Sequence, residues 1–202
     1  MDQDVERGAR NEPELPRVAV IGAGTLGWQI AAMTAASGRR VTLFDRDPAA
    51  PARALERLRQ TLTPVIANGE LEWNLDEVIR RIDIGADLAS SVAAVDLVIE
   101  AVREDLDTKR ELFVVLSDLA PTAILATNSS SLPSALLVDV VARPERLLNL
   151  HFFDIFWRRA MVELMSCGAT SDDVLATMDR FGRSLDLLTA TVLGQSKGFI
   201  IN

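Results

Sequence analysis

Residues 17–45 read RVAVIGAGTLGWQIAAMTAASGRRVTLFD, and this stretch decides the fold. It begins with an apolar, β-branched run of the kind that is buried on both faces of a sheet. After a glycine-rich turn, Leu26, Ile30 and Met33 recur at helical spacing. A second short apolar run then closes on Asp45. The pattern predicts a strand, a glycine turn, a helix and a second strand.

The glycine turn has the pattern of a dinucleotide-binding site. Its first glycine permits a tight turn, its second lets the backbone approach a pyrophosphate, and its third lets helix and strand pack closely. The helix that follows offers free N–H groups and the positive end of its dipole to phosphates. Asp45 stands where a carboxylate accepts the ribose hydroxyls and repels a 2′-phosphate, although Arg46 beside it offsets part of that repulsion. We therefore expect NAD rather than NADP, bound by Gly22, Ala23, Gly24, Thr25, Leu26, Gly27 and Asp45.

Strands and helices continue to alternate along the chain. Helical patterns cover residues 48–80 with a break at 68–69, 105–119, a short segment after Pro133, and 171–185. Strand patterns cover residues 82–84, 95–101, 123–127, 147–153 and 161–165. This alternation predicts an α/β fold, a Rossmann-type doubly wound, mainly parallel sheet flanked by helices.

Composition narrows the class of protein. The net charge of −8 argues against a nucleic-acid partner. Apolar runs fall short of the roughly 20 residues that span a bilayer, so we expect no membrane partner. The single cysteine, Cys167, excludes an internal disulfide and a cysteine-rich metal site. We expect a cytoplasmic protein without a bound metal.

Three segments divide the chain. Residues 1–16 are polar, contain two prolines and lack the apolar core of a signal peptide, so we expect a disordered lead-in. Residues 17–195 form the predicted nucleotide-binding domain. Residues 196–202 begin a new apolar run, which predicts a linker or helix leading to a helical C-terminal domain that is absent from this sequence.

His151 is the only histidine, and it ends a predicted strand. Glu163 lies on what the pattern predicts to be the next strand. A histidine held by a carboxylate can take a hydroxyl proton while the same carbon gives a hydride to a nicotinamide. The alternative is a half-buried histidine packed against Phe152 and Phe153, with a solvated glutamate. Patterning by itself leaves both interpretations open.

Several stretches resemble the N-terminal domain of the 3-hydroxyacyl-CoA dehydrogenase family. They are VAVIGAGTLGWQIA, VDLVIEAVRED with TKRELF, ATNSSSLPSALL, LNLHFF, VELM and GFIIN, in family order over nearly the whole chain after residue 16. The resemblance implies an NAD-dependent oxidoreductase of fatty acid metabolism that interconverts a 3-hydroxyacyl thioester and its 3-oxoacyl form. It also implies a further helical domain, which closes over the thioester and usually forms a homodimer.

The resemblance assigns roles to individual residues. His151 matches the catalytic histidine and Glu163 its carboxylate partner. Ser130 matches a serine that touches both substrate and nicotinamide, and Asn202 an asparagine that completes the active site.

Glu104 and Lys109 fall where the family contacts the cofactor. Their alternative is a pair of solvated residues around a helix start. The alternative for Ser130 is a role, with its two serine neighbours, in the turn before Pro133.

One segment departs from the family. After the histidine the family typically reads HFFNP, whereas this chain reads HFFDIFWRR, with Asp154 in place of the asparagine. The acyl group therefore stays open, as does the carrier, coenzyme A or a carrier protein. A free hydroxy acid as substrate and a non-catalytic NAD-binding relative are the alternatives. Arg53, Arg57 and Arg59 fit a solvated helix face better than a site for coenzyme A phosphates.

Overall fold

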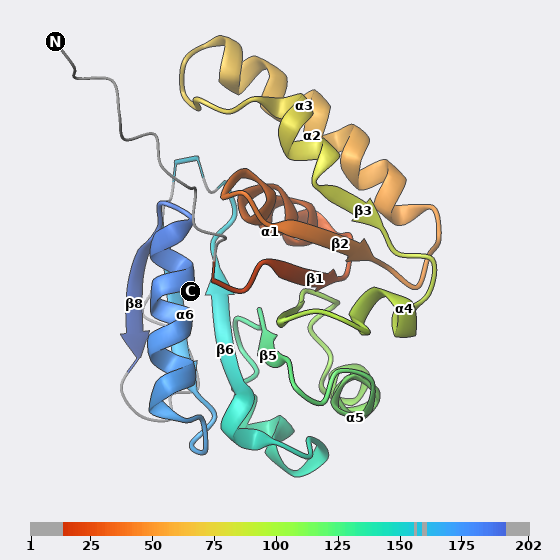
Figure 1. The fold of residues 1–202 in the computed structure, drawn as a ribbon, viewed down its shortest axis with the longest axis vertical. Coiled ribbons are helices and arrows are strands. Elements are labelled where there is room, and N and C mark those ends of the chain that lie inside the picture. The colour runs from red at the N-terminus through yellow and green to blue at the C-terminus, as the bar shows by residue number, and fades with distance from the viewer. Residues whose placement is uncertain (1–13, 156, 159–160, 193–202) are drawn as a thin grey trace, which may run out of the picture.

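One eight-stranded sheet organises the molecule (Figure 1). The structure, a computed structural model, describes residues 14–155, 157–158 and 161–192. The strand order is β3-β2-β1-β4-β5-β6-β7-β8, and every neighbouring pair is parallel except β6 and β7. The strands are β1 (Arg17–Ile21), β2 (Arg40–Phe44), β3 (Ile82–Ile84), β4 (Leu97–Glu100), β5 (Ile124–Thr127), β6 (Leu147–Phe152), β7 (Met161–Ser166) and β8 (Leu188–Val192).

Helices cover both faces of this sheet. The α-helices are α1 (Thr25–Ala36), α2 (Ala50–Ala67), α3 (Leu75–Arg80), α4 (Leu88–Val92), α5 (Leu106–Leu119) and α6 (Asp172–Ser184), and two 3-10 helices are η1 (Ser134–Val140) and η2 (Pro144–Arg146). Alternate residues of β1 enter two separate apolar clusters, Val18 and Val20 with α1, α2 and α6, and Ala19 and Ile21 with α5 and η1. The predicted doubly wound α/β fold is confirmed.

The sheet changes winding direction between β1 and β4. Both strands are parallel and adjacent, but β2 and β3 extend to one side of them and β5 and β6 to the other. Loops leaving the carboxyl ends of β1 and β4 therefore diverge and leave a crevice, which is where open α/β sheets bind their ligands.

The antiparallel pair of strands, β6 and β7, determines how His151 and Glu163 lie relative to each other. Strands β6 and β7 pair with His151 directly opposite Glu163. Directly opposed residues project from the same face of a sheet with adjacent Cβ atoms. The pairing thus sets the two predicted catalytic side chains beside each other.

Residues 14–16, which the sequence places in the disordered lead-in, pack against the domain. The buried guanidinium of Arg39 donates two hydrogen bonds to the Glu14 carbonyl at 3.1 and 2.9 Å and lies 4.8 Å from the ring centre of Phe181. Arg180 on α6 also pairs with the Glu14 carboxylate at 2.9 Å. A buried cation requires acceptors, and this short segment supplies them.

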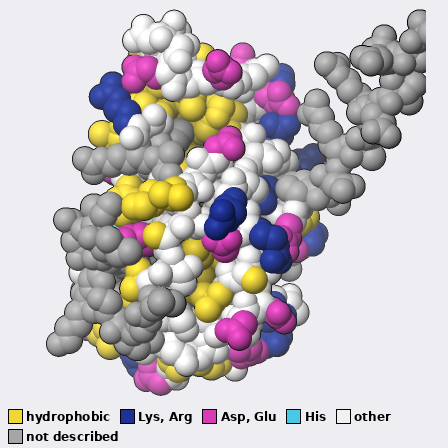
Figure 2. All heavy atoms as spheres, turned by 90° about the vertical axis from the view of Figure 1, so that its left-hand side faces the viewer, with side chains coloured by type: hydrophobic (Ala, Val, Ile, Leu, Met, Phe, Trp, Pro, Cys, Tyr) yellow, Lys and Arg dark blue, Asp and Glu magenta, His cyan; other side chains and the backbone are white. Residues whose placement is uncertain are grey.

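Figure 2 shows the α6 and β8 face, where basic and acidic side chains are interspersed.

Several elements differ from the sequence expectation. The short helix α4 and the edge strand β8 were not predicted, because five-residue segments with few apolar positions give weak periodicity. The helix after Pro133 is a 3-10 helix. Residues 196–202, including Asn202, lie outside the described residues. Within the described part of the chain, no helix has the length and apolar character to cross a bilayer.

Candidate functional site: a dinucleotide crevice next to a histidine–glutamate pair

Two adjoining cavities follow the carboxyl ends of the strands. The larger, about 480 Å³, lies against the glycine turn, the end of β2 and the start of α5. The smaller, about 230 Å³, is lined by Leu26, Glu104, Lys109, Asn128, Ser130 and His151. Ala101 and Val102 line both cavities, so the two adjoin at the loop after β4.

The glycine turn leaves room for a phosphate group. An added Cβ on Gly24 would meet nothing within 4 Å, whereas one on Gly27 would lie 1.8 Å from the Gly22 carbonyl oxygen. Gly22 itself has a φ of +109°, which disfavours any residue with a side chain. Helix α1 has no side-chain cap and no acidic residue in its first turn. Its uncapped N–H groups and its dipole fit an anionic pyrophosphate.

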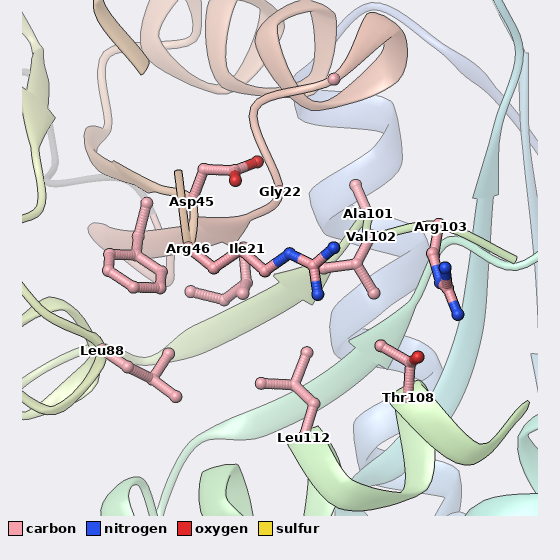
Figure 3. Close-up of a pocket in the computed structure, with 12 residues that line it drawn as sticks. Ile21, Gly22, Asp45, Arg46, Leu88, Ala101, Val102, Arg103, Thr108 and Leu112 are labelled. Carbon is pink, nitrogen blue, oxygen red and sulfur yellow. The ribbon is translucent and has the colours of Figure 1, made fainter. Parts of the chain in front are cut away.

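Asp45 lies at the end of β2 with its carboxylate turned toward the glycine turn (Figure 3). One of its oxygens accepts a hydrogen bond from the Ala23 amide at 2.8 Å, and the other accepts one from the Asp47 amide at 2.9 Å. The Arg46 side chain extends across the larger cavity in the same view, between the aliphatic Leu88 and Val102. The cavity therefore offers a carboxylate, apolar walls and a planar cation, a set that suits an adenosine group.

Glu104 organises the loop that follows β5. Its carboxylate accepts hydrogen bonds from the Ser129 hydroxyl, from the Ser131 amide at 2.9 Å and from the Ser131 hydroxyl at 2.8 Å. Burial raises the pKa of Glu104, but these hydrogen bonds and the nearby Lys109 ammonium lower it by more. The pKa of Glu104 is therefore about 2, below the ordinary 4.5. Ser130, between the two bound serines, lines the smaller cavity. Ser129 and Ser131 thus hold the loop in place, whereas Ser130 faces the cavity.

Lys109 is buried, with 1% of its surface exposed, so the interpretation of a solvated residue is wrong for it. Its ammonium lies 2.6 Å from Glu100 Oε1 and 3.4 Å from Glu104 Oε2. Long side chains at the start of a helix can reach back to the preceding strand end, and here the buried Glu100 carboxylate receives the ammonium.

His151 and Glu163 form a buried pair. The Nδ1 atom of His151 lies 3.0 Å from Glu163 Oε2, and the two residues are 6% and 0% exposed. The imidazole ring centre is 4.8 Å from that of Phe153. Because a carboxylate only accepts hydrogen bonds, the contact fits the imidazole tautomer that carries its proton on Nδ1 and has a lone pair on Nε2. Such a ring can accept a proton from a hydroxyl group in the cavity.

The segment after His151 is held from two directions. Asp154 accepts a hydrogen bond from Gln29 Nε2 of α1 at 2.5 Å, and Gln29 Oε1 accepts one from the Ile155 amide at 2.9 Å. Arg158 pairs with Glu70 at 3.1 Å. The segment that departs from the family pattern is therefore hydrogen-bonded to α1 through Asp154 and the Ile155 amide.

Of the sequence-predicted residues, Gly22, Gly24 and Asp45 line the larger cavity, and Leu26, Glu104, Lys109, Ser130 and His151 line the smaller one. Two of the three candidate arginines are in exposed pairs, Arg53 with Asp47 and Arg59 with Asp76. Sequence reasoning missed Glu100 and Asn128. The signal for Glu100 was present, since an acidic residue inside a predicted buried strand requires a partner.

A glycine turn at a winding reversal, an acid at the end of β2 and cavities along the carboxyl ends of the strands define a dinucleotide-binding domain of the Rossmann type. The chain belongs to the 3-hydroxyacyl-CoA dehydrogenase family, because residues 17–194 match its NAD-binding domain. The resemblance noted in the sequence is thus confirmed, as is the predicted cofactor, NAD.

Individual relatives agree with this assignment. The chain is 34% identical over 195 residues to a probable 3-hydroxybutyryl-CoA dehydrogenase of Bacillus subtilis, covering 94% of this chain and 66% of that protein. It is 37% identical over 164 residues to a 3-hydroxyadipyl-CoA dehydrogenase of Escherichia coli, covering 78% of this chain and 34% of that one. A solved diketoreductase structure, described as acting on dicarbonyl compounds, superposes with a TM-score of 0.89 at 32% identity, covering 94% of this chain and 68% of that one. The chain therefore spans two thirds or less of the two sequence relatives.

Proposed function

We propose that this chain is the cofactor-binding and proton-transfer part of an NAD-dependent dehydrogenase that interconverts a 3-hydroxyacyl thioester and its 3-oxoacyl form. The observation that carries the proposal is the buried pair of His151 and Glu163, with Nδ1 3.0 Å from Oε2, and His151 lines a cavity next to the dinucleotide crevice. The names of the relatives support a coenzyme A thioester as the substrate class.

Each residue has a role set by its position. The glycine turn and the first turn of α1 bind the pyrophosphate, and Asp45 binds the adenosine ribose. When bound, NAD supplies a nicotinamide ring that accepts a hydride from the carbon bearing the hydroxyl group. His151 Nε2 takes the hydroxyl proton as the carbon becomes a carbonyl, and returns it in the reverse direction. Glu163 keeps the imidazole oriented and stabilises its protonated form.

Three other predicted residues complete the proposal. Ser130 faces the same cavity as His151 and would hold the substrate oxygen there. Lys109 and Glu104 would contact the nicotinamide half of the cofactor from the wall of that cavity. Asn202 would complete the site near the carbonyl group. A homodimer and a cytoplasmic location are part of the same proposal.

Activity assays with the His151→Asn variant test the proposal. The protein, in excess over NADH so that a slow rate is measurable, is mixed with acetoacetyl-CoA, and loss of NADH absorbance is followed. We expect the variant to lose at least 100-fold in rate, about the general-base contribution, while its NADH affinity stays within about twofold of the unmodified protein. Equal rates for the two proteins would refute the role of His151. Absence of any NADH oxidation by the unmodified protein would refute the reaction.

A second candidate substrate class is favoured by the segment after His151. Asp154 is exposed and stands where the family has an asparagine, and the diketoreductase structure acts on dicarbonyl compounds. A free dicarbonyl compound and an acetoacetyl carrier protein are therefore included as parallel substrates. A higher rate with either than with acetoacetyl-CoA would assign the protein to that class.

A further inference from the structure

Glu100 is a buried carboxylate beneath the smaller cavity. It ends β4 and has 0% of its surface exposed. Its Oε1 atom accepts hydrogen bonds from Lys109 Nζ at 2.6 Å and from the Val102 amide at 2.7 Å. Its Oε2 atom accepts one from the Thr127 hydroxyl at 2.6 Å. Both carboxylate oxygens are thus bound by groups from three different segments of the chain.

Two of the three residues that Glu100 binds line the cavities. Lys109 lines the smaller cavity together with Ser130 and His151, and Val102 lines both cavities. Thr127 lies at the end of β5, directly before the loop that carries Ser130. Glu100 itself lines neither cavity, so its effect on a ligand must pass through these neighbours.

Stability alone gives a weak account of this ion pair. Removing two charges from water opposes folding. Replacing a buried ion pair by well-packed apolar side chains of similar volume often leaves the stability of a protein unchanged or raises it. A lysine side chain has four flexible carbons, so an ammonium that must stand at one place requires an anchor. The Lys109 ammonium has three protons and two carboxylate neighbours, Glu100 and Glu104. The ammonium thus has one N–H more than it has carboxylate neighbours, and Lys109 lines the smaller cavity.

We propose that Glu100 is a positioning residue of the cofactor site, which holds the Lys109 ammonium in the cavity wall beside Ser130 and His151. The inference rests on the proposed function, because it takes the nicotinamide half of the dinucleotide as the ligand of this cavity. Glu104 extends the same chain of contacts from Lys109 to the serines on either side of Ser130. The network therefore sets both the ammonium and the serine loop from one buried carboxylate.

A double-mutant cycle tests this role. NADH is titrated into the unmodified protein, Glu100→Gln, Lys109→Met and the double variant, and binding is followed by energy transfer from tryptophan to NADH. If Glu100 acts through Lys109, each single change weakens NADH binding about tenfold, the scale of one charge-assisted hydrogen bond, and the double variant is also weakened about tenfold. Independent contributions would multiply to about 100-fold.

Thermal unfolding separates this role from a purely structural one. Ser117 on α5 is buried, lines neither cavity and accepts a hydrogen bond from the Ala142 amide at 2.7 Å. Ser117→Ala removes this hydrogen bond without touching Glu100 or Lys109, so we expect a lower Tm with NADH affinity within about twofold. An affinity loss in Ser117→Ala as large as that of Glu100→Gln would overturn the proposal, as would unchanged affinity in Glu100→Gln.

The cycle also remains decisive if Glu100→Gln does not fold. The double variant has no charge at either position, so it avoids the unpaired buried ion that each single change leaves, and its NADH affinity is compared with that of the unmodified protein. A loss of about tenfold in the double variant supports the proposal, whereas a loss of about 100-fold, or none, overturns it. Failure of NADH to bind the unmodified protein would instead refute the proposed function itself.

Discussion

Adding a methyl group to two glycines of the same turn should change two different properties of the protein. It should lower the Tm at Gly27 and weaken NADH binding at Gly24. In Gly27→Ala the new Cβ would stand 1.8 Å from the Gly22 carbonyl oxygen, and backbone must move by more than an ångström to relieve the contact. Overpacking of this kind costs about 1–3 kcal/mol, only partly offset by the better helix propensity of alanine. About 1–2 kcal/mol then remains, and with about 2–4 °C per kcal/mol for a domain of this size Gly27→Ala should lower Tm by roughly 2–8 °C.

Gly24→Ala should leave stability almost unchanged. Its φ of −73° is accessible to alanine, and the new Cβ meets nothing within 4 Å. The loss of a preferred N-cap residue and the reduced entropy of the unfolded chain nearly cancel, so the net change should stay within about 0.5 kcal/mol. The same methyl group occupies the space through which the backbone approaches a pyrophosphate. NADH affinity should therefore fall at least about tenfold, or about 1.4 kcal/mol.

Tm and NADH titration on the two variants give the comparison. Gly24→Ala with unchanged NADH affinity would refute the placement of the pyrophosphate at this turn. Gly27→Ala with unchanged Tm would refute the close approach of α1 to the Gly22 backbone. Since both variants add the same group to the same turn, each controls for the other.

Two further predictions concern carboxylates of the site. Asp45→Ala should weaken NADH binding about tenfold and NADPH binding much less, because Arg46 remains and the charge that repels a 2′-phosphate is gone; equal losses in the two titrations would contradict this. For Glu104, the native pKa of about 2 lies below the ordinary 4.5, so its contribution to stability is present above pH 4.5 and is lost as the pH falls toward 2. The Tm advantage of the unmodified protein over Glu104→Gln should accordingly shrink between pH 6 and pH 2 to 3, and a constant difference across that range would speak against the hydrogen-bonded carboxylate.

Much of the domain is encoded in local pattern. The glycine turn, the helix after it and the acid at the end of the second strand are readable because each depends on neighbouring residues only: φ requirements, helical spacing and a fixed offset. The positions of β1, α1, β2, α5 and β6 follow the predicted segments closely for the same reason. Short elements such as α4 and β8 carry too few residues for a clear period.

Which side chains meet was decided by tertiary structure. The sequence left open whether His151 and Glu163 touch, and the antiparallel register of β6 and β7 placed them opposite each other. Among three adjacent serines only the family resemblance singled out Ser130, and in the structure Glu104 binds the two on either side while Ser130 lines the cavity.

Local periodicity specifies which face of an element is buried, because burial depends on the residue's own polarity and its position in the repeat. The partner of a polar group depends instead on strand order and register between segments far apart in the chain. The sequence by itself therefore determined the cofactor turn and the fold class. Only the assembled sheet determined the histidine–glutamate pair and the buried carboxylate beneath Lys109.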